Sequence, residues 1–317
     1  MNVVVSGASG LIGRALCASL SRDGHRVQRL VRRAAAAADE IAWDPPAGTI
    51  DGARLDGADA VVHLAGANVG DGRWTEARKR ELRDSRLVPT ALLAKTLAAC
   101  AHKPRVFVSA SAVGWYGTRT ETVDEKAPHS HDFLGELCAG WEAAADAARA
   151  AGIRVVHPRI GIVLSTEGGA LAKMLPPFRL GLGAVIGDGR APFSWVAHDD
   201  VIAALRFLVD RDDLAGPFNL TSPEPTTQRE FAVAIGHVLH RPVLFRMPGA
   251  LLRLAVGEMA ESVLGGAAVV PTQLLAAGFR FQFPSLTAAL EHALRVDSAR
   301  EARSSSINDG GGDRMQR

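Results

Sequence analysis

Apolar residues along the chain fall into two kinds of segment. In short runs they follow one another with little polar alternation, which is typical of parallel strands buried on both faces. These runs predict strands at residues 3–5, 27–31, 60–64, 105–108 and 154–157. In longer segments apolar residues recur every three or four positions, which predicts helices at residues 11–22, 75–100 and 133–151. Because strands and helices alternate, we expect an α/β fold with a Rossmann-type, doubly wound parallel sheet.

The pattern changes after the fifth predicted strand. Residues 165–190 are rich in glycine and contain two adjacent prolines, which indicates an excursion from the sheet. A strand at 193–196 and a helix at 199–209 follow. Further on, Thr227 and Glu230 have the spacing of a capping box before an apolar helix face. The second half of the chain therefore combines a return to the sheet with a separate, mainly helical part.

These segments suggest two domains and a tail. We expect a dinucleotide-binding Rossmann domain at residues 1–165, to which 193–222 return. Residues 166–192 and 223–297 should form a smaller, mainly helical C-terminal substrate cap. Residues 298–317 are rich in Ser, Gly, Asp and Arg and poor in apolar residues, so we expect them to be disordered.

A glycine-rich loop lies between the first predicted strand and the first predicted helix. Its first glycine permits a tight turn, its second lets the backbone approach a pyrophosphate, and its third lets the helix pack closely on the strand. The helix N-terminus then offers free N–H groups and a partial positive charge to phosphates. We expect the dinucleotide to be bound here by Gly7, Ser9, Gly10, Leu11, Ile12 and Gly13.

The end of the second predicted strand bears on the choice of cofactor. An NAD site usually has Asp or Glu there to hold the ribose 2′-hydroxyl, whereas this strand is followed by Arg32 and Arg33. A guanidinium can pair bidentately with a 2′-phosphate, which favours NADP(H). Arg32 is the first candidate and Arg33 the second. The alternative is that both are solvated arginines at the end of a strand.

Composition narrows the function further. The net charge is only +2 and no basic run is interleaved with aromatic residues, so we expect no nucleic acid partner. We see neither an apolar run long enough to span a membrane nor a signal peptide, and expect a cytoplasmic protein. Cys17, Cys100 and Cys138 are far apart in sequence, so we expect them to be reduced thiols in the cytoplasm and not part of a disulfide framework. The ten histidines show no paired ligand spacing, so we expect no metal site. The partner should be a small-molecule substrate, and a homodimer stays open.

Four motifs together resemble those of the extended short-chain dehydrogenase/reductases, the NAD-dependent epimerase/dehydratase superfamily. They are the glycine loop 7–13, His63-Leu64-Ala65-Gly66, Ser109-Ala110-Ser111 and Trp115-Tyr116-Gly117. Other segments are similar to an atypical epimerase-family branch with its own C-terminal domain. These segments are 73–75, Lys79, 85–86, 195–200, 216–219 and 278–279.

The resemblance implies several further site residues. It implies that His63, Leu64, Ala65 and Gly66 lie beside the adenosine and ribose, at the end of a strand. It implies that Ser111 is the catalytic serine. It also implies cofactor contacts from Ser109, Pro158 and Ile160, the last two following the strand beside the nicotinamide. For each of these residues alone, ordinary packing at a strand end is the alternative.

The chain departs from this family at its catalytic pair. Alignment on Glu142 puts Leu134 at the position of the family's catalytic tyrosine and Cys138 at that of its lysine. Neither side chain can replace the pair, because tyrosine exchanges the substrate proton and lysine lowers its pKa and holds the ribose. The remaining candidates for proton transfer are Ser111, Tyr116, which is the only tyrosine, water and the substrate itself.

Arg73, Lys79 and Arg86 could contact the cofactor or an anionic substrate, with salt bridges on the helix surface as the alternative. Two functions follow from the sequence. The first is an NADP(H)-dependent oxidoreductase or epimerase acting on a small carbonyl or sugar-type substrate with a nonstandard proton donor. The second is a weakly active or inactive NADP(H)-binding protein that acts as a sensor or binds a partner. A serine hydrolase is disfavoured because the chain has no GxSxG motif.

Overall fold

A computed structural model describes residues 1–309, and side chains to residue 297. One large sheet organises it, with strand order β14-β9-β6-β5-β1-β2-β3-β4. All neighbouring strands in this order are parallel except β3 and β4. The strands are β1 (Asn2–Ser6), β2 (Arg26–Val31), β3 (Glu40–Asp44), β4 (Thr49–Ile50), β5 (Ala60–His63), β6 (Val106–Ser109), β9 (Arg154–Ile160) and β14 (Gly216–Leu220). The prediction of a Rossmann-type parallel sheet is confirmed.

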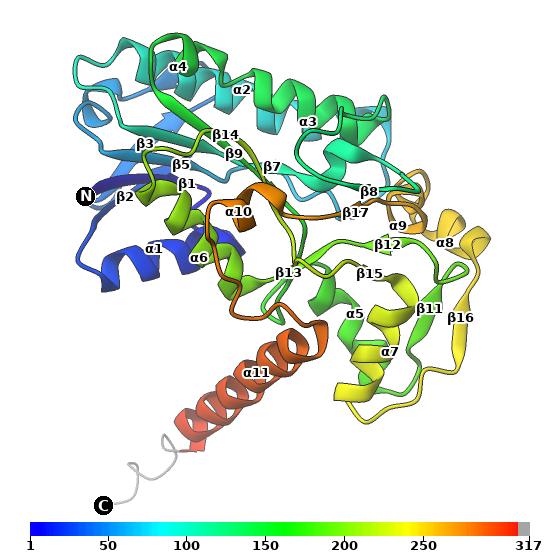
Figure 1. Ribbon diagram of the computed structural model, residues 1–317. Coiled ribbons are helices and arrows are strands. Elements are labelled where there is room, and N and C mark those ends of the chain that lie inside the picture. The colour runs from blue at the N-terminus through cyan, green and yellow to red at the C-terminus, as the bar shows by residue number, and fades with distance from the viewer. Residues whose placement is uncertain (310–317) are drawn as a thin grey trace, which may run out of the picture.

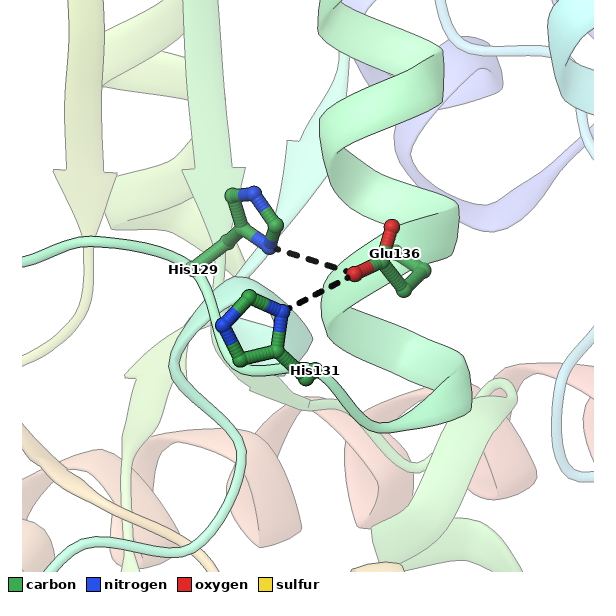
Figure 2. A group of neighbouring side chains, drawn as sticks. All are labelled: His129, His131 and Glu136. Atoms are coloured by element: carbon green, nitrogen blue, oxygen red, sulfur yellow. Dashed lines mark hydrogen bonds and ion pairs between the residues drawn. The ribbon is translucent and has the colours of Figure 1, made fainter.

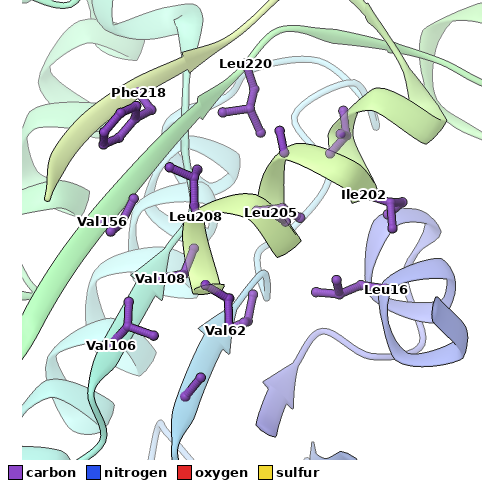
Figure 3. Packing of buried hydrophobic residues seen from close by; sticks show 14 of the residues in the cluster. Leu16, Val62, Val106, Val108, Val156, Ile202, Leu205, Leu208, Phe218 and Leu220 are labelled. Atoms are coloured by element: carbon purple, nitrogen blue, oxygen red, sulfur yellow. The ribbon is translucent and has the colours of Figure 1, made fainter. Parts of the chain in front are cut away.

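Helices cover both faces of this sheet (Figure 1). One face carries α1 (Leu11–Arg22) and α6 (His198–Asp210), and the other carries α2 (Glu76–Ala99), α3 (Phe133–Ala143) and α4 (Asp146–Ala150). Val3 and Val5 of β1 pack into the α1/α6 cluster, whereas Val4 between them packs into the opposite cluster. Figure 3 shows Leu16, Leu205 and Leu208 meeting the strand valines of the first cluster. Both faces are apolar, which explains why the strands showed no alternation.

Three local predictions differ from the structure. Strands β3 and β4 were not predicted, because β3 mixes buried and exposed residues beside the short edge strand β4 and follows β2 without a helix. The single helix expected at 133–151 is split between α3 and α4, and the strand expected at 154–157 runs to Ile160. Pro158 is accommodated because it lies opposite the gap between β6 and β7 (Ser111–Ala112), both of which pair with β9.

The second part of the molecule surrounds a separate cluster that includes Leu175, Trp195 and Phe231. The predicted capping box at Thr227 and Glu230 is present. Of the segment expected to return to the sheet, α6 and β14 do so, whereas its start forms small sheets with other segments. The helices of this part are α5 (Gly169–Arg179), α7 (Gln228–Val238), α8 (Gly249–Val256), α9 (Met259–Leu264), α10 (Thr272–Ala276) and α11 (Leu286–Asp309).

Short strand pairs complete the fold. They are β10 (Ile162–Leu164) with β13 (Trp195–Ala197), β11 (Ala184–Ile186) with β16 (Phe245–Met247), β12 (Pro192–Phe193) with β15 (Thr226–Thr227), and β8 (Thr122–Val123) with β17 (Ala268–Val269). Two 3-10 helices, η1 (Gly52–Arg54) and η2 (Val113–Tyr116), lie in the first half.

The C-terminal end of the chain differs in part from expectation. We expected disorder from Ser298, whereas α11 continues to Asp309, and the expectation of disorder stays a prediction. This stretch contains alanine, arginine and glutamate, which favour helix. The remainder of the predicted tail, 310–317, lies outside the described residues. Across residues 1–309, no helix has both the length and the apolar character needed to cross a bilayer.

The segment around β17 is tied to the main sheet by side chains. Ser194 donates to Ala267 O at 2.7 Å and accepts from Val269 N at 3.0 Å. Thr221 donates to Val269 O at 3.0 Å, and Asn219 Nδ2 donates to Val270 O at 3.0 Å. These bonds attach residues 267–270 firmly to the end of β14 and to the segment before β13.

Candidate active site

The glycine loop lies where the strand order reverses, between β1 and β5. In open α/β sheets, ligands bind outside the carboxyl ends of the strands at such a point. Gly7 has φ +69, and a Cβ there would lie 2.8 Å from the carbonyl carbon of Leu64. A Cβ on Gly13 would lie 2.2 Å from Gly7 O. Both glycines are therefore required for close packing between the loop, α1 and the end of β5.

Gly10 has a different role. A Cβ on Gly10 would contact only Gly7 O, at 3.2 Å, within the described structure, so its other side is open. Gly10 is the N-cap of α1, where no side chain caps the helix, and both Ser9 and Gly10 are exposed. The N–H groups of Leu11 and Ile12 belong to the first turn, which has no intrahelical acceptors. This open helix N-terminus fits the diphosphate of a dinucleotide.

Arg32 and Arg33 differ in their surroundings. Arg33 donates to both carboxylate oxygens of Glu40, at 2.8 and 2.6 Å, and this bond lowers the pKa of Glu40 to about 2. Arg32 is exposed and has no ion pair or hydrogen bond within the described part of the chain. Both line a shallow hollow of about 330 Å³ together with Trp43 and Asp44 at the end of β3. Arg32 is therefore the guanidinium available to a ligand at this edge.

His63 is placed differently from what the resemblance implied. Its side chain is fully buried beneath the loop, with Nδ1 2.5 Å from Ser6 Oγ, and burial lowers its pKa to about 3. Ser6 Oγ also accepts from Leu64 N at 3.2 Å, so the pair joins β1 to the end of β5. The accessible part of this motif is Leu64, Ala65 and Gly66. His63 thus supports the ligand edge from within rather than facing a ligand.

Ser111 belongs to a buried polar network at the next part of the sheet edge. Its Oγ donates to Glu142 Oε1 at 2.7 Å. Arg159 binds the same carboxylate through Nε at 2.8 Å and Nη2 at 3.0 Å, and its guanidinium lies 3.6 Å from the centre of the Trp115 ring. Ser111, Glu142 and Arg159 are all buried. A serine hydroxyl bonded to a buried carboxylate has a partner for proton exchange.

Tyr116 lies at the far end of the same network. Its hydroxyl donates to Asn219 Oδ1 at 2.7 Å and accepts from Arg159 Nη1 at 3.0 Å. The residue is fully buried, and this burial raises its pKa. Because the hydroxyl is engaged as donor and acceptor, this geometry favours a structural role for Tyr116 over that of a proton donor.

Leu134 and Cys138, the residues that the sequence alignment on Glu142 puts at the family's tyrosine and lysine positions, lie on α3 and face η2. A Cβ on Gly114 would lie 3.2 Å from Leu134 Cβ and 3.7 Å from Cys138 Sγ. Leu134 packs into an apolar cluster with Trp74, and burial raises the pKa of Cys138 to about 12. These side chains supply neither an acid nor a positive charge next to the segment that follows Ser111.

The other predicted cofactor residues are mostly buried. Ser109 ends β6, and its buried Oγ has no hydrogen-bond partner among the described residues. Its carbonyl oxygen lies 3.3 Å from His157 Nδ1. Pro158 is buried in β9, whereas Ile160 is partly exposed at the end of the strand. Ile160 is therefore the best placed of the three to contact a ligand.

Residues of this region that sequence reasoning missed include Arg159, Asn219 and Glu125. Glu125 accepts from the backbone N–H groups of Asn219 and Gln273, so it joins the network to the C-terminal segment. Arg159 lies between Pro158 and Ile160, which the resemblance implied, and Asn219 ends the similar segment 216–219, but the sequence offered no signal for Glu125. They are brought together from separate elements by the order of the strands.

A second polar group lies on the surface beside α3 (Figure 2). One ligand atom each from His129, His131 and Glu136 lies within 4.8 Å of the others. Both imidazoles approach Glu136 Oε1, at 3.9 and 3.2 Å. We expected no metal site, and the described structure nevertheless gathers three side chains of metal-binding type. The spacing of the histidines gave no sign of this group, because Glu136 approaches them only through the turn into α3.

Comparisons with known proteins agree with this architecture. A model of the NAD dependent epimerase/dehydratase family matches residues 3–220, and a domain of unknown function, DUF1731, matches residues 247–293. The chain is 43% identical over 293 residues to an epimerase family protein of Mycobacterium leprae, covering 92% of this chain and 95% of the relative. It is 37% identical over 298 residues to the mouse epimerase family protein SDR39U1, covering 92% and 99%.

Solved structures give the same result. The human epimerase family protein SDR39U1 (isoform 2), crystallised with NADPH, has a TM-score of 0.85 and 35% identity, covering 92% of this chain and 99% of that chain. A nucleoside-diphosphate sugar epimerase from Corynebacterium glutamicum has a TM-score of 0.76 and 32% identity, covering 96% and 61%. The chain belongs to the NAD dependent epimerase/dehydratase family and carries the DUF1731 domain at its C-terminal end.

Proposed function

We propose that the protein is an NADP(H)-dependent oxidoreductase or epimerase that acts on a small carbonyl or sugar-type substrate. The open N-terminus of α1 at Gly10 and the unpaired Arg32, within the described chain, support binding of a 2′-phosphorylated dinucleotide. The relative crystallised with NADPH supports the same cofactor. The similarity to a nucleoside-diphosphate sugar epimerase supports a sugar-type substrate.

The hydrogen bond from Ser111 to Glu142 carries the catalytic part of this proposal. A bound nicotinamide supplies a hydride acceptor or donor. Ser111 donates its hydrogen to Glu142, so its oxygen lone pairs can accept a hydrogen bond from a substrate hydroxyl. During oxidation of that hydroxyl, Ser111 takes the substrate proton as its own proton moves to Glu142. In the reverse direction the proton returns to the substrate oxygen by the same two steps.

The second candidate function is a sensor or partner-binding protein that retains the dinucleotide without turnover. The observation that favours it is the apolar character of Leu134 and the protonated thiol of Cys138. The two functions share the cofactor and differ only in whether Ser111 and Glu142 exchange a proton with a substrate.

The deciding experiment is a turnover screen with NADPH and NADP⁺ over carbonyl compounds and nucleotide sugars. Ser111→Ala should abolish any turnover while leaving NADPH affinity within about twofold, because the hydroxyl acts on the substrate oxygen. Ser21→Ala, at an exposed position on α1, is the matched control and should leave both unchanged. Turnover that survives Ser111→Ala would exclude the serine relay, and tight NADPH binding without turnover on any substrate would favour the sensor.

A further inference from the structure

Arg86 on α2 is a buried arginine that has no carboxylate partner within the described residues. Its Nη1 donates to Leu82 O at 3.0 Å, and its Nη2 donates to Ala67 O at 2.9 Å. Its guanidinium lies 5.0 Å from the centre of the Trp141 ring. A buried charge is costly unless an opposite charge or a set of hydrogen bonds compensates it. Arg159, the other buried arginine of this region, has such a partner in Glu142.

The guanidinium of Arg86 lies at the ligand edge of the sheet. Its Cζ is 3.4 Å from the position that a Cβ on Gly66 would take. Gly66 is exposed and follows Leu64 and Ala65, whose backbone contacts the glycine loop at Gly7. The guanidinium of Arg86 therefore lies next to the place between β1 and β5 where the strand order reverses. It is on the side of β5 that faces away from Arg32 and β3.

Arg86 also lies close to the position aligned with the missing lysine. The ring beneath it, Trp141, is one helical turn from Cys138 on α3, and Arg86 lowers the pKa of the Cys138 thiol against the larger effect of burial. A guanidinium on α2 thus brings a fixed positive charge to the region where α3 carries none.

Part of the guanidinium is not used by the protein. Its hydrogen bonds within residues 1–309 involve Nη1 and Nη2, and Nε has no acceptor there. The Nε and Nη2 edge is the one through which Arg159 binds both oxygens of Glu142. In Arg86, the Nε–H and one remaining Nη2–H could serve a ligand oxygen in the same way.

We propose that Arg86 binds the nicotinamide half of the dinucleotide, donating to its phosphate or ribose oxygens in place of the lysine absent from α3. The inference rests on the proposed NADP(H) binding. In this proposal Arg86 holds the ribose, as the family's lysine does. It has no tyrosine whose pKa it could lower, since Leu134 occupies the tyrosine position.

The test compares two ligands that share the adenosine half. NADPH carries the nicotinamide half, whereas 2′,5′-ADP lacks it. Arg86→Gln should weaken NADPH binding roughly 10- to 100-fold, the range for loss of a hydrogen bond from a charged group. Binding of 2′,5′-ADP should change less than about twofold. Arg83→Gln, exposed on the same helix, is the control and should alter neither affinity. Titration calorimetry gives both constants without requiring turnover.

Several results would overturn the proposal. If folded Arg86→Gln binds NADPH as the wild type does, Arg86 does not contact the ligand. If both ligands lose affinity equally, Arg86 only supports the fold of the loop. If Arg86→Gln does not fold, Arg86→Lys takes its place, because it keeps the charge but changes the donor geometry. The affinities of this variant for NADPH and 2′,5′-ADP are then compared in the same way. If the wild type binds 2′,5′-ADP and NADPH equally well, the proposed role of Arg86 is wrong, while the proposed cofactor NADP(H) is unaffected. If it binds neither, both proposals fall.

Discussion

The two halves of the candidate site, on either side of β5, differ in the groups that form them. On the β1 side, backbone and open space define the site, because Gly10 leaves the N-terminus of α1 uncovered and Arg32 projects into solvent. On the β9 side, buried charged side chains fill the equivalent region, with Arg159 and Glu142 bound to each other. Gly10 and Arg32 can therefore be changed at little cost to folding, whereas Gly7 and Gly13 beside them, and the charged network of the second half, contribute to the stability of the protein.

The comparison predicts that variants in the two halves will fail in different ways. Variants at Gly10 and Arg32 should lose affinity for the cofactor and keep most of their stability. Variants that break the buried ion pair between Arg159 and Glu142 should lose stability first. Four experiments test this distinction.

The largest effect is expected for Glu142→Gln. The variant removes the charge that compensates buried Arg159, and breaking a buried ion pair costs about 3–5 kcal/mol. Urea unfolding measures the change in the free energy of unfolding. Glu136→Gln on the same helix, at an exposed position, should cost less than about 0.5 kcal/mol. Equal stability of the two variants would contradict the structural role of the network.

Gly10→Val should have the next largest effect, and mainly on binding. The branched side chain occupies the place where a diphosphate approaches the backbone, so NADPH affinity should fall by about 100-fold or more. The free energy of unfolding should fall by only about 1 kcal/mol, because an added Cβ meets a single atom, Gly7 O, at 3.2 Å. Gly168→Val, where an added Cβ meets nothing within 4 Å, is the control. Normal NADPH affinity in Gly10→Val would place the phosphates elsewhere.

Arg32→Ala should weaken NADPH binding about tenfold or more and change NADH binding little, since only NADPH carries the 2′-phosphate. Arg33→Ala should have a smaller effect, about threefold or less, because Arg33 is bound to Glu40. Fluorescence titration with both cofactors measures the two ratios. If NADH and NADPH lose affinity alike in Arg32→Ala, discrimination does not come from this arginine.

The smallest change is expected at Cys138. With a pKa of about 12, its thiol is almost fully protonated at pH 8 and should resist iodoacetamide in the folded protein. Labelling should increase as the pH rises toward that value, and it should be rapid after unfolding in urea. Mass spectrometry distinguishes this site from Cys17, which is only partly buried. Rapid labelling of Cys138 at pH 8 would mean that the α3 side of the site is open.

The same contrast explains how much of the molecule could be predicted from its sequence. The glycine loop was predicted because its function depends on consecutive backbone positions, so Gly7, Gly10 and Gly13 appear together in the chain. The parallel sheet was predicted from its apolar runs. Strand β3 was missed because it mixes buried and exposed residues near the edge of the sheet and follows β2 without a helix between them.

The network could not be predicted in this way. Ser111 and Arg159 are neighbours only because β7 pairs with β9, and Glu142 reaches them from α3. Tyr116 was a reasonable candidate as the only tyrosine, but nothing in its sequence surroundings indicates that Asn219, over a hundred residues later, accepts its hydroxyl hydrogen. Long-range pairing of strands determines these contacts.

The bonds that attach residues 267–270 to Ser194, Asn219 and Thr221 hold this segment of the C-terminal part in place. A cap that closes over a ligand needs a hinge, and hinges form at segments with few fixed contacts. The β17 segment is fastened to the sheet and cannot pivot. In contrast, β16 and α8, which precede β17 in sequence, have no buried residues. Limited proteolysis should accordingly cut around β16 and α8 well before it cuts near β17.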